Sequence, residues 1–342
     1  MTASHARAEL LDQDTVVAYL RGRGLLDDQS TRVRELDGGV SNTVLSVESA
    51  GHAWVVKQSL PTLRVAQEWR AKQERTLNEA RGLAVAARLT PGHVPGVVDV
   101  DPERFVLVIE RAPDGLTPWK GLLLQGVVHE PVAATLGRLL GTWHHATAAD
   151  PALVEGLDDP EAFDQLRVEP YHLATAQALP DVRDAVLAVA DAMAARRICL
   201  VHGDFSPKNI LTGPGGTWVL DFEVAHRGDP DFDVAFLVTH LLLKAVHRPA
   251  HRGAYAAAAA AFLRAYSDAT RPLRETGLQA EPEHLVAHVG VLLLARTDGR
   301  SPAEYLTAPE RDIVRRVGRR VLTRRPPSVP RVWDVLAEEA DR

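Results

Sequence analysis

The order of predicted strands and helices indicates an α+β protein with two lobes, a small β-rich lobe over residues 1–112 and a larger, mainly helical lobe over residues 113–342. A chain of 342 residues is longer than one compact hydrophobic core usually organises. Short segments of alternating polarity, separated by turn residues, gather in the first part of the chain. Segments with the apolar period of a helix dominate the rest and are interrupted by one strand-like island at residues 198–222.

The small lobe is expected to contain a β-meander. Leucine and valine residues recur on one side of residues 9–26, which predicts an amphipathic helix. A second helix is predicted over residues 64–89, which are rich in Ala, Glu, Arg and Leu and end before a Pro-Gly pair. Alternating patterns and turn residues predict strands at 33–36, 43–47, 53–57, 97–100 and 105–109.

The second lobe is expected to be a set of helices around a β-hairpin. The island at residues 198–222 contains two apolar stretches on either side of a Pro-Gly-Gly turn. An alanine run at residues 254–261 predicts a helix that packs closely on a neighbour. Helices are predicted at 131–148, 183–196, 232–247, 252–268, 282–295, 308–323 and 331–340.

Composition argues against several classes of protein. The net charge of −6 and the pI near 6.2 disfavour a nucleic-acid-binding protein, which usually carries a basic excess. No apolar run is long enough to cross a bilayer, and the first residues lack a signal-peptide pattern, so no membrane association is expected. The single cysteine, Cys199, cannot form an internal disulfide, which favours the cytoplasm. We expect a monomer or a homodimer.

The strongest chemical signal is the stretch from His202 to Asn209, followed by an apolar strand that ends at Asp221. Phosphoryl transfer needs a carboxylate that orients the attacking hydroxyl, a role that suits Asp204. It also needs oxygen ligands for Mg²⁺, a role that suits Asn209 and Asp221. In the alternative interpretation the stretch is only structural: Asp204 caps a turn, and Asn209 adopts a left-handed conformation.

The spacing H-G-D-x-x-x-x-N, then D-F-E, then Gly228 to Asp233 resembles the aminoglycoside phosphotransferase family, a group that includes choline, homoserine and methylthioribose kinases. The resemblance implies a bilobal protein-kinase-like fold and phosphoryl transfer from ATP or GTP, with Mg²⁺, to a small molecule. Gly203 and Glu223 stand where protein kinases have arginine and glycine, which disfavours a protein substrate. The same resemblance suggests that Asp229 and Asp233 cap or brace the catalytic loop.

In the small lobe the resemblance assigns Lys57, at the end of a strand, to the α- and β-phosphates. Its expected partner is Glu79 on the following helix, with Glu68 and Glu74 as alternatives. Lys208 either reaches the γ-phosphate as a catalytic residue or lies exposed.

Two further segments are expected to bind the nucleotide. The turn at residues 38–42 lies where a phosphate-covering loop belongs, with Gly39, Ser41 and Asn42 as candidates, although Gly-Gly is as often an ordinary hairpin turn. Residues 105–112 resemble the family's last small-lobe strand, which runs into the hinge between the lobes, where backbone groups of Glu110 and Ala112 would hold the base.

The acceptor is expected to be a small molecule with a hydroxyl group. The presumed acceptor wall mixes both charges, which disfavours a polycation and favours a neutral or partly anionic sugar, nucleoside or glycosylated natural product, an antibiotic among them. Residues 56–65 and the D-x-E motif also resemble methylthioribose kinases, so the alternatives are a metabolic sugar kinase of that kind and a non-catalytic nucleotide-binding module. The charged residues of the presumed wall are Glu281, Glu283, Arg296, Asp298, Arg300 and Glu304.

Overall fold

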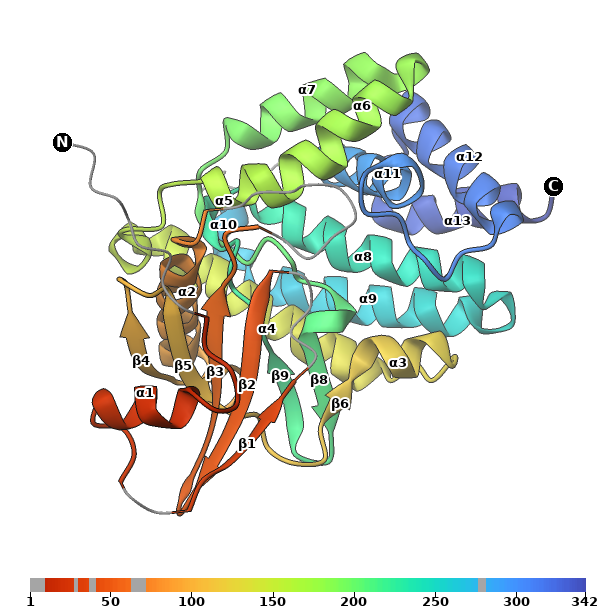
Figure 1. The fold of residues 1–342 in the computed structure, drawn as a ribbon. Coiled ribbons are helices and arrows are strands. Elements are labelled where there is room, and N and C mark those ends of the chain that lie inside the picture. The colour runs from red at the N-terminus through yellow and green to blue at the C-terminus, as the bar shows by residue number, and fades with distance from the viewer. Residues whose placement is uncertain (1–9, 28–29, 37–40, 63–71, 276–280) are drawn as a thin grey trace.

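The structure is a computed structural model that describes residues 10–27, 30–36, 41–62, 72–275 and 281–342. Its first part is built on a five-stranded antiparallel sheet with the strand order β1-β2-β3-β5-β4 (Figure 1). Gly51, with φ of +79°, occupies the tight turn between β2 and β3, where a residue with a side chain would be strained. The strands are β1 Arg32–Glu35, β2 Asn42–Ser49, β3 His52–Ser59, β4 Val97–Asp101 and β5 Val106–Glu110.

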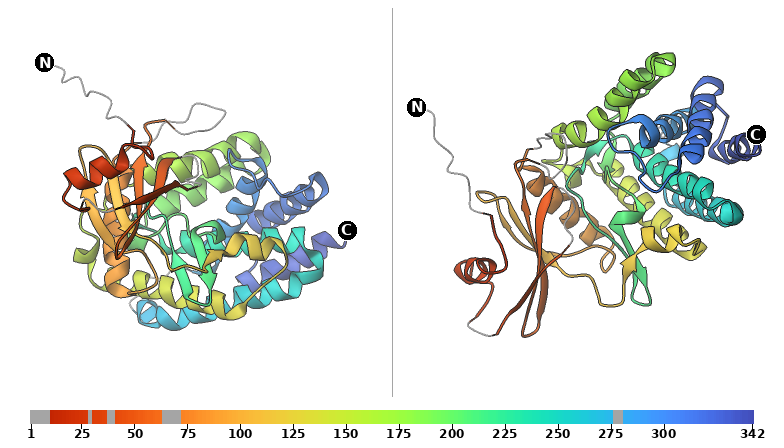
Figure 2. Two further views of the ribbon diagram at one scale, coloured as in Figure 1. Left: turned by 60° about the horizontal axis from the view of Figure 1, so that its bottom comes forward. Right: turned by 45° about the vertical axis from the view of Figure 1, so that its right-hand side comes forward.

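Helices cover both faces of this sheet (Figure 2). Successive side chains of β5 point to opposite faces, and all of them except Glu110 are buried. Val106 and Val108 belong to one apolar cluster with helix α1, Val16–Gly22. Leu107 belongs to the main core together with residues of helix α2, Arg75–Leu89.

The two predicted helices of this lobe are shorter than expected. The prediction of a continuous helix over residues 9–26 was wrong, because Leu11 is buried ahead of the helix and a turn intervenes. In that turn the Asp12 carboxylate accepts hydrogen bonds from the backbone N–H of Asp14 and Thr15. Of the helix predicted over residues 64–89, the part at 64–71 lies outside the described residues.

The second part of the structure consists of helices around two small sheets (Figure 1). One sheet pairs β7, Cys199–Val201, with β10, His226–Gly228. The other joins β6, Thr117–Pro118, to the hairpin of β8, Ile210–Gly213, and β9, Gly216–Val219. The helices are α3 Trp119–Leu124, α4 Glu130–Ala149, α5 Glu161–Phe163, the π-helix η2 Asp164–Leu173, α6 Ala174–Ala178, α7 Arg183–Ala194, α8 Pro230–His247, α9 Arg252–Ala269, α10 Arg271–Glu275, α11 Pro282–Asp298, α12 Ala308–Arg324 and α13 Val329–Ala340.

Helix α9, which contains the alanine run, packs closely on α4, and this prediction is confirmed. A Cβ atom added at Gly137 of α4 would lie 2.3 Å from the carbonyl oxygen of Phe262 in α9. Helix α8 is buried along nearly its whole length and forms the centre of this part of the core. None of the helices in the described ranges is both long and apolar enough to cross a membrane.

Candidate active site

A cleft of about 650 Å³ is lined by residues of the five-stranded sheet and by residues of the helical part. Of the predicted site residues that the structure describes, only Asn42 is not part of its lining, and Gly39 lies outside the described residues. The predicted residues that line it are Ser41, Lys57, Glu79, Glu110, Ala112, Asp204, Lys208, Asn209 and Asp221.

The loop after β7 is held by the first turn of α8. The Asp233 carboxylate accepts hydrogen bonds from the backbone N–H of His202 at 2.6 Å and of Gly203 at 2.8 Å. Gly203 has φ of +76°, and a Cβ atom there would lie 2.8 Å from the Val224 side chain, so this position requires glycine. The expectation that Asp233 braces the loop is confirmed.

His202 locks the same loop to the strand that follows it. Its Nδ1 accepts a hydrogen bond from the backbone N–H of Asp204 at 3.1 Å, and its Nε2 lies 3.0 Å from the carbonyl oxygen of Leu220. A backbone N–H can only donate and a carbonyl can only accept, so the ring is the neutral tautomer with its proton on Nε2. Burial lowers the pKa of His202, which agrees with a neutral ring.

Asp204 is a buried carboxylate between two cations. Its Oδ2 lies 2.7 Å from Nη2 of Arg167 and 2.8 Å from Nζ of Lys208. Burial alone would raise the pKa of Asp204, but the charges of Arg167 and Lys208 outweigh it and lower the pKa. Asp204 is therefore ionised at neutral pH and able to accept a hydrogen bond from a hydroxyl group.

Arg167 is a site residue that the sequence analysis missed. It lies in η2, where its Nε donates a hydrogen bond to the carbonyl oxygen of Gly203 at 2.8 Å. The segment around it has no strong apolar period and contains Pro170, so no helix was predicted there.

Lys57 lies in the cleft between two carboxylates. Its Nζ is 2.6 Å from Glu79 Oε1 and 2.8 Å from Asp221 Oδ1. Burial alone would lower the pKa of Lys57, but the Asp221 and Glu79 carboxylates raise it, so the ammonium group stays charged. Of the alternative partners, Glu74 precedes the first residue of α2, and Glu68 lies outside the described residues.

Asp221 and Asn209 present oxygen atoms to the same region. Asp221 has φ of +72°, a left-handed conformation that few residues other than glycine adopt and that often marks a functional site. Asn209 is not left-handed, contrary to the structural alternative. Its Nδ2 donates to the backbone oxygen of Asp204 at 3.0 Å, which leaves the amide oxygen available. A carboxylate and an amide oxygen suit a hard cation such as Mg²⁺.

Glu223 ties the start of β2 to the segment after Asp221. It accepts hydrogen bonds from Ser41 Oγ at 3.0 Å and Asn42 Nδ2 at 3.1 Å, and Arg75 Nε lies 3.2 Å away. The side chains of Ser41 and Asn42 are thus engaged with Glu223, and their contact with phosphate stays a prediction. At the hinge, Glu110 accepts a hydrogen bond from the backbone N–H of Gly96 at 3.0 Å, and Ala112 lines the cleft nearby.

The opposite end of the cleft differs from the acceptor wall predicted from the sequence. Of the six predicted charged residues, only Arg296 and Glu304 line the cleft, so the prediction was wrong for Glu281, Glu283, Asp298 and Arg300. Asp298, for example, pairs with Arg315 at 2.9 Å. Sequence reasoning erred here because a position in or next to α11 does not tell which side chains face the cleft.

Two cations dominate this end of the cleft. Lys244, on α8, is buried, and its Nζ lies 5.3 Å from the centre of the Tyr305 ring. Within the described part of the chain, neither Lys244 nor Arg296 has a carboxylate partner, whereas Glu304 pairs with Lys120 at 2.6 Å. Burial, and then the charges of Arg296 and Lys120, lower the pKa of Lys244 to about 7.

The sequence model of the APH family, described as the phosphotransferase enzyme family, matches residues 32–276. The chain belongs to this family. A methylthioribose kinase of Bacillus cereus (strain B4264) is 26% identical over 265 residues, which cover 70% of this chain and 67% of that protein. The family resemblance expected from the sequence is thus confirmed, and the activity class is that of a small-molecule kinase.

Solved structures with similar folds include a choline/ethanolamine kinase family protein and a choline kinase. A choline/ethanolamine kinase family protein from Mesorhizobium loti aligns with a TM-score of 0.50 at 17% identity, over 95% of this chain and 99% of that chain. A choline kinase from Cryptosporidium parvum Iowa II aligns with a TM-score of 0.52 at 10% identity, over 96% of each chain. These similarities concern the fold, and they confirm the predicted α+β, protein-kinase-like architecture.

Proposed function

We propose that this family member transfers the γ-phosphoryl group of Mg²⁺-bound ATP or GTP to a hydroxyl group of a small molecule. The observation that supports this most is the position of Asp204, a buried and ionised carboxylate, in the same cleft as the Lys57–Glu79–Asp221 group. In this proposal residues 1–112 form a nucleotide-binding lobe and residues 113–342 form an acceptor-binding lobe, with the cleft between them. A cytoplasmic monomer or homodimer is part of the same proposal.

In the proposed reaction Asp204 accepts a hydrogen bond from the acceptor hydroxyl and aims its oxygen at the γ-phosphorus. As the new O–P bond forms and the bond to the β-phosphate oxygen breaks, the hydroxyl proton moves to Asp204. Lys57 holds the α- and β-phosphates, and Lys208 lies beside Asp204, where it faces the transferred group. Asn209 and Asp221 would hold Mg²⁺, which neutralises phosphate charge when it is bound.

The lowered pKa of Asp204 makes it a weak base in the free enzyme, because Arg167 and Lys208 stabilise its ionised form. Orientation of the hydroxyl and electrostatic stabilisation are therefore its main contributions, with proton transfer late in the reaction. A nucleotide-binding module without activity is less consistent with this site, since the proposed hydroxyl-orienting carboxylate, metal ligands and phosphate-binding lysine all meet in one cleft.

The charges at the far end of the cleft support an acceptor that is neutral or anionic. Lys244 and Arg296 would repel a polycationic aminoglycoside and would attract a carboxylate, a phosphate or an electron-rich hydroxyl cluster. A sugar-like or nucleoside-like acceptor, an antibiotic of that kind included, fits this pocket. The similarity to methylthioribose kinases favours a metabolic sugar as the second candidate.

An assay of ADP or GDP release tests the acceptor class directly. Acceptors of graded charge would be compared: aminoglycosides, neutral sugars and nucleosides, methylthioribose, and sugar acids. We expect turnover with neutral or anionic compounds, and Arg296→Gln should raise KM for an anionic acceptor about 10-fold or more, the usual cost of a lost charge-assisted hydrogen bond. Turnover with polycations alone would contradict this acceptor class.

Replacement of Lys244 by methionine is expected to stabilise the free protein. Burial lowers the pKa of Lys244 to about 7 from its ordinary value of 10.5, so the unfolded chain binds the proton more tightly. The free energy of unfolding therefore falls as the pH falls from 10.5 towards 7, and Lys244→Met removes this penalty. At pH 7 we expect a gain of about 1–4 kcal/mol, as for other buried charges replaced by apolar groups.

The stability gained by Lys244→Met should be smaller at pH 10 than at pH 7. Thermal unfolding of the variant and of the unaltered protein at both pH values would measure the difference. Lys72→Met, at a half-exposed lysine paired with Glu161, is the matched control and should change stability little. An unchanged or lower melting temperature of Lys244→Met at pH 7 would contradict the claim that buried Lys244 destabilises the folded protein.

A further inference from the structure

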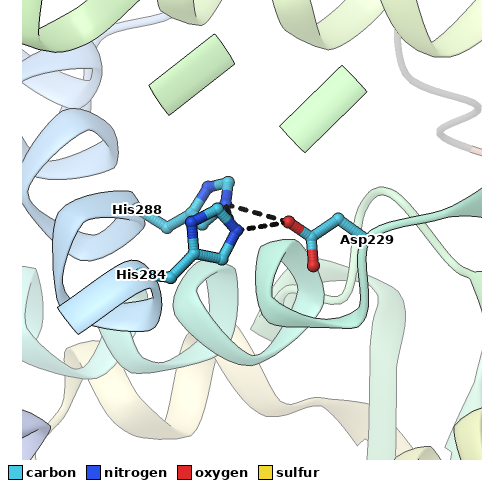
Figure 3. Close-up of side chains that lie close together, drawn as sticks. All are labelled: Asp229, His284 and His288. Carbon is cyan, nitrogen blue, oxygen red and sulfur yellow. Dashed lines mark hydrogen bonds and ion pairs between the residues drawn. The ribbon is translucent and has the colours of Figure 1, made fainter. Parts of the chain in front are cut away.

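Three side chains outside the proposed active site converge on one point. Asp229 precedes the first turn of α8, and His284 and His288 lie one turn apart on α11 (Figure 3). The side chains of Asp229 and His288 are fully buried, and that of His284 is 16% exposed. Figure 3 shows both imidazole rings and the carboxylate directed towards one another.

Two of the three distances among these groups are close to those between metal ligands, and the third is that of a hydrogen bond. Asp229 Oδ2 lies 2.6 Å from His284 Nε2 and 3.4 Å from His288 Nε2, and the two Nε2 atoms are 3.2 Å apart. Ligand atoms of a tetrahedral Zn²⁺ site, with metal–nitrogen bonds near 2.0–2.1 Å, lie about 3.3 Å from one another. Two histidines four residues apart on a helix, with a carboxylate from another element, are a common source of such ligands.

Protons alone satisfy this arrangement poorly. A neutral imidazole carries one N–H, so an Nε2 atom that donates to Asp229 cannot accept from the other ring. If both rings donate to Asp229 Oδ2, the contact of His288 at 3.4 Å is only a long hydrogen bond. If one ring accepts instead, its lone pair faces the carboxylate oxygen. A single cation between the three atoms removes this conflict.

Neighbouring groups orient the Asp229 carboxylate, and a second carboxylate follows it in the chain. The second oxygen of Asp229 is 3.2 Å from Arg196 Nε and accepts a hydrogen bond from the backbone N–H of Asp231, which fixes the carboxylate. Asp231 lies two residues after Asp229, in the first turn of α8. Its side chain forms no hydrogen bond or ion pair within the described ranges, so a cation would meet a second carboxylate nearby.

We propose that Asp229, His284 and His288 bind a divalent transition-metal ion of the Zn²⁺ type, with a water molecule completing the coordination. The site joins the start of α8 to the start of α11. The first of these helices carries Asp233, which holds the loop of Asp204, and the second carries Arg296 of the acceptor end. The ion therefore has a structural role, separate from the Mg²⁺ of the proposed reaction, and the proposal does not depend on that reaction.

Metal analysis of the untagged protein tests the proposal, because a histidine tag would bind metal by itself. The protein purified from zinc-supplemented cells is expected to retain one Zn²⁺ per chain after gel filtration. Replacement of the ion by Co²⁺ should produce visible absorption bands, a direct signal of coordination that does not depend on activity. Removal by a strong chelator should lower the melting temperature, and added Zn²⁺ should restore it.

Two ligand variants and one control locate the site. His288→Gln and Asp229→Asn keep hydrogen-bonding groups of similar size but should weaken Co²⁺ binding about 100-fold or more. His129→Gln, at an exposed histidine that precedes α4, should bind Co²⁺ as the unaltered chain does.

Two results would overturn the proposal. In the first, the unaltered chain retains no stoichiometric metal, gives no Co²⁺ absorption and melts at the same temperature with and without Zn²⁺. The cluster would then be a hydrogen-bonded part of the core. In the second, both ligand variants bind Co²⁺ as strongly as the unaltered chain, which would place the ion elsewhere. Because the unaltered chain is measured first, poor folding of a variant cannot hide either outcome.

Discussion

Asp204→Asn is expected to lower kcat by about 10²- to 10⁴-fold, the usual contribution of a positioned acid–base group. The amide has the shape of the carboxylate but cannot take the hydroxyl proton, and it attracts neither Arg167 nor Lys208. Because Lys57 and the hinge near Ala112 are unchanged, affinity for the nucleotide should remain close to that of the unaltered enzyme. Steady-state kinetics and calorimetric titration with ATP would measure the two quantities separately.

Loss of the charge also leaves Arg167 buried without its anionic partner, so the melting temperature of this variant must be measured with the kinetics. Asp268→Asn, at an exposed aspartate that pairs with Arg271 on the surface, serves as the control and should retain full turnover. An Asp204→Asn enzyme that is folded and turns over at the original rate would remove Asp204 from the mechanism.

Asp221→Asn is expected to lower kcat/KM by about 10³-fold or more. Asp221 is proposed to hold Mg²⁺, and it also positions Lys57 at 2.8 Å, so a single change weakens both the metal and the phosphate contacts. The Mg²⁺ concentration needed for half-maximal rate should rise as well. This distinguishes Asp221→Asn from Asp204→Asn, for which the Mg²⁺ requirement should stay constant.

The control for this effect is Glu79→Gln. It removes the other carboxylate at Lys57 but none of the proposed metal ligands, so activity should fall while the Mg²⁺ requirement changes little. An Asp221→Asn enzyme with the original Mg²⁺ dependence would show that Asp221 does not bind the metal.

Features formed by residues close together in the sequence could be predicted from it. The loop from His202 to Asn209 and the strand that ends at Asp221 form a continuous hairpin, so their residues were expected to meet. The contact of Lys57 with Glu79 was the pairing preferred from the family resemblance, with Glu68 and Glu74 as alternatives. The order of the elements was sufficient to predict the α+β architecture.

Contacts between distant segments could not be predicted. Arg167 pairs with Asp204 from a π-helix that has no clear apolar period. The two residues lie on separate segments, and nothing in the sequence indicates that they form an ion pair. Asp229 was expected to cap or brace the catalytic loop, but its side chain instead caps α8 and contacts two histidines of α11. Lys244 was not singled out in the sequence, and only the packing of the apolar helix α8 shows that this residue lines the cleft.

The central claim is that the chain moves a γ-phosphoryl group to a small-molecule hydroxyl with the help of Asp204. The most direct test uses ATP labelled with ¹⁸O in its γ-phosphoryl group, Mg²⁺, and an acceptor that supports nucleotide release, followed by mass spectrometry of the acceptor. We predict an acceptor that gains the labelled phosphoryl group in reactions with the unaltered chain and gains almost none with Asp204→Asn. Labelled inorganic phosphate without any phosphorylated acceptor, or equal labelling by both proteins, would contradict the account.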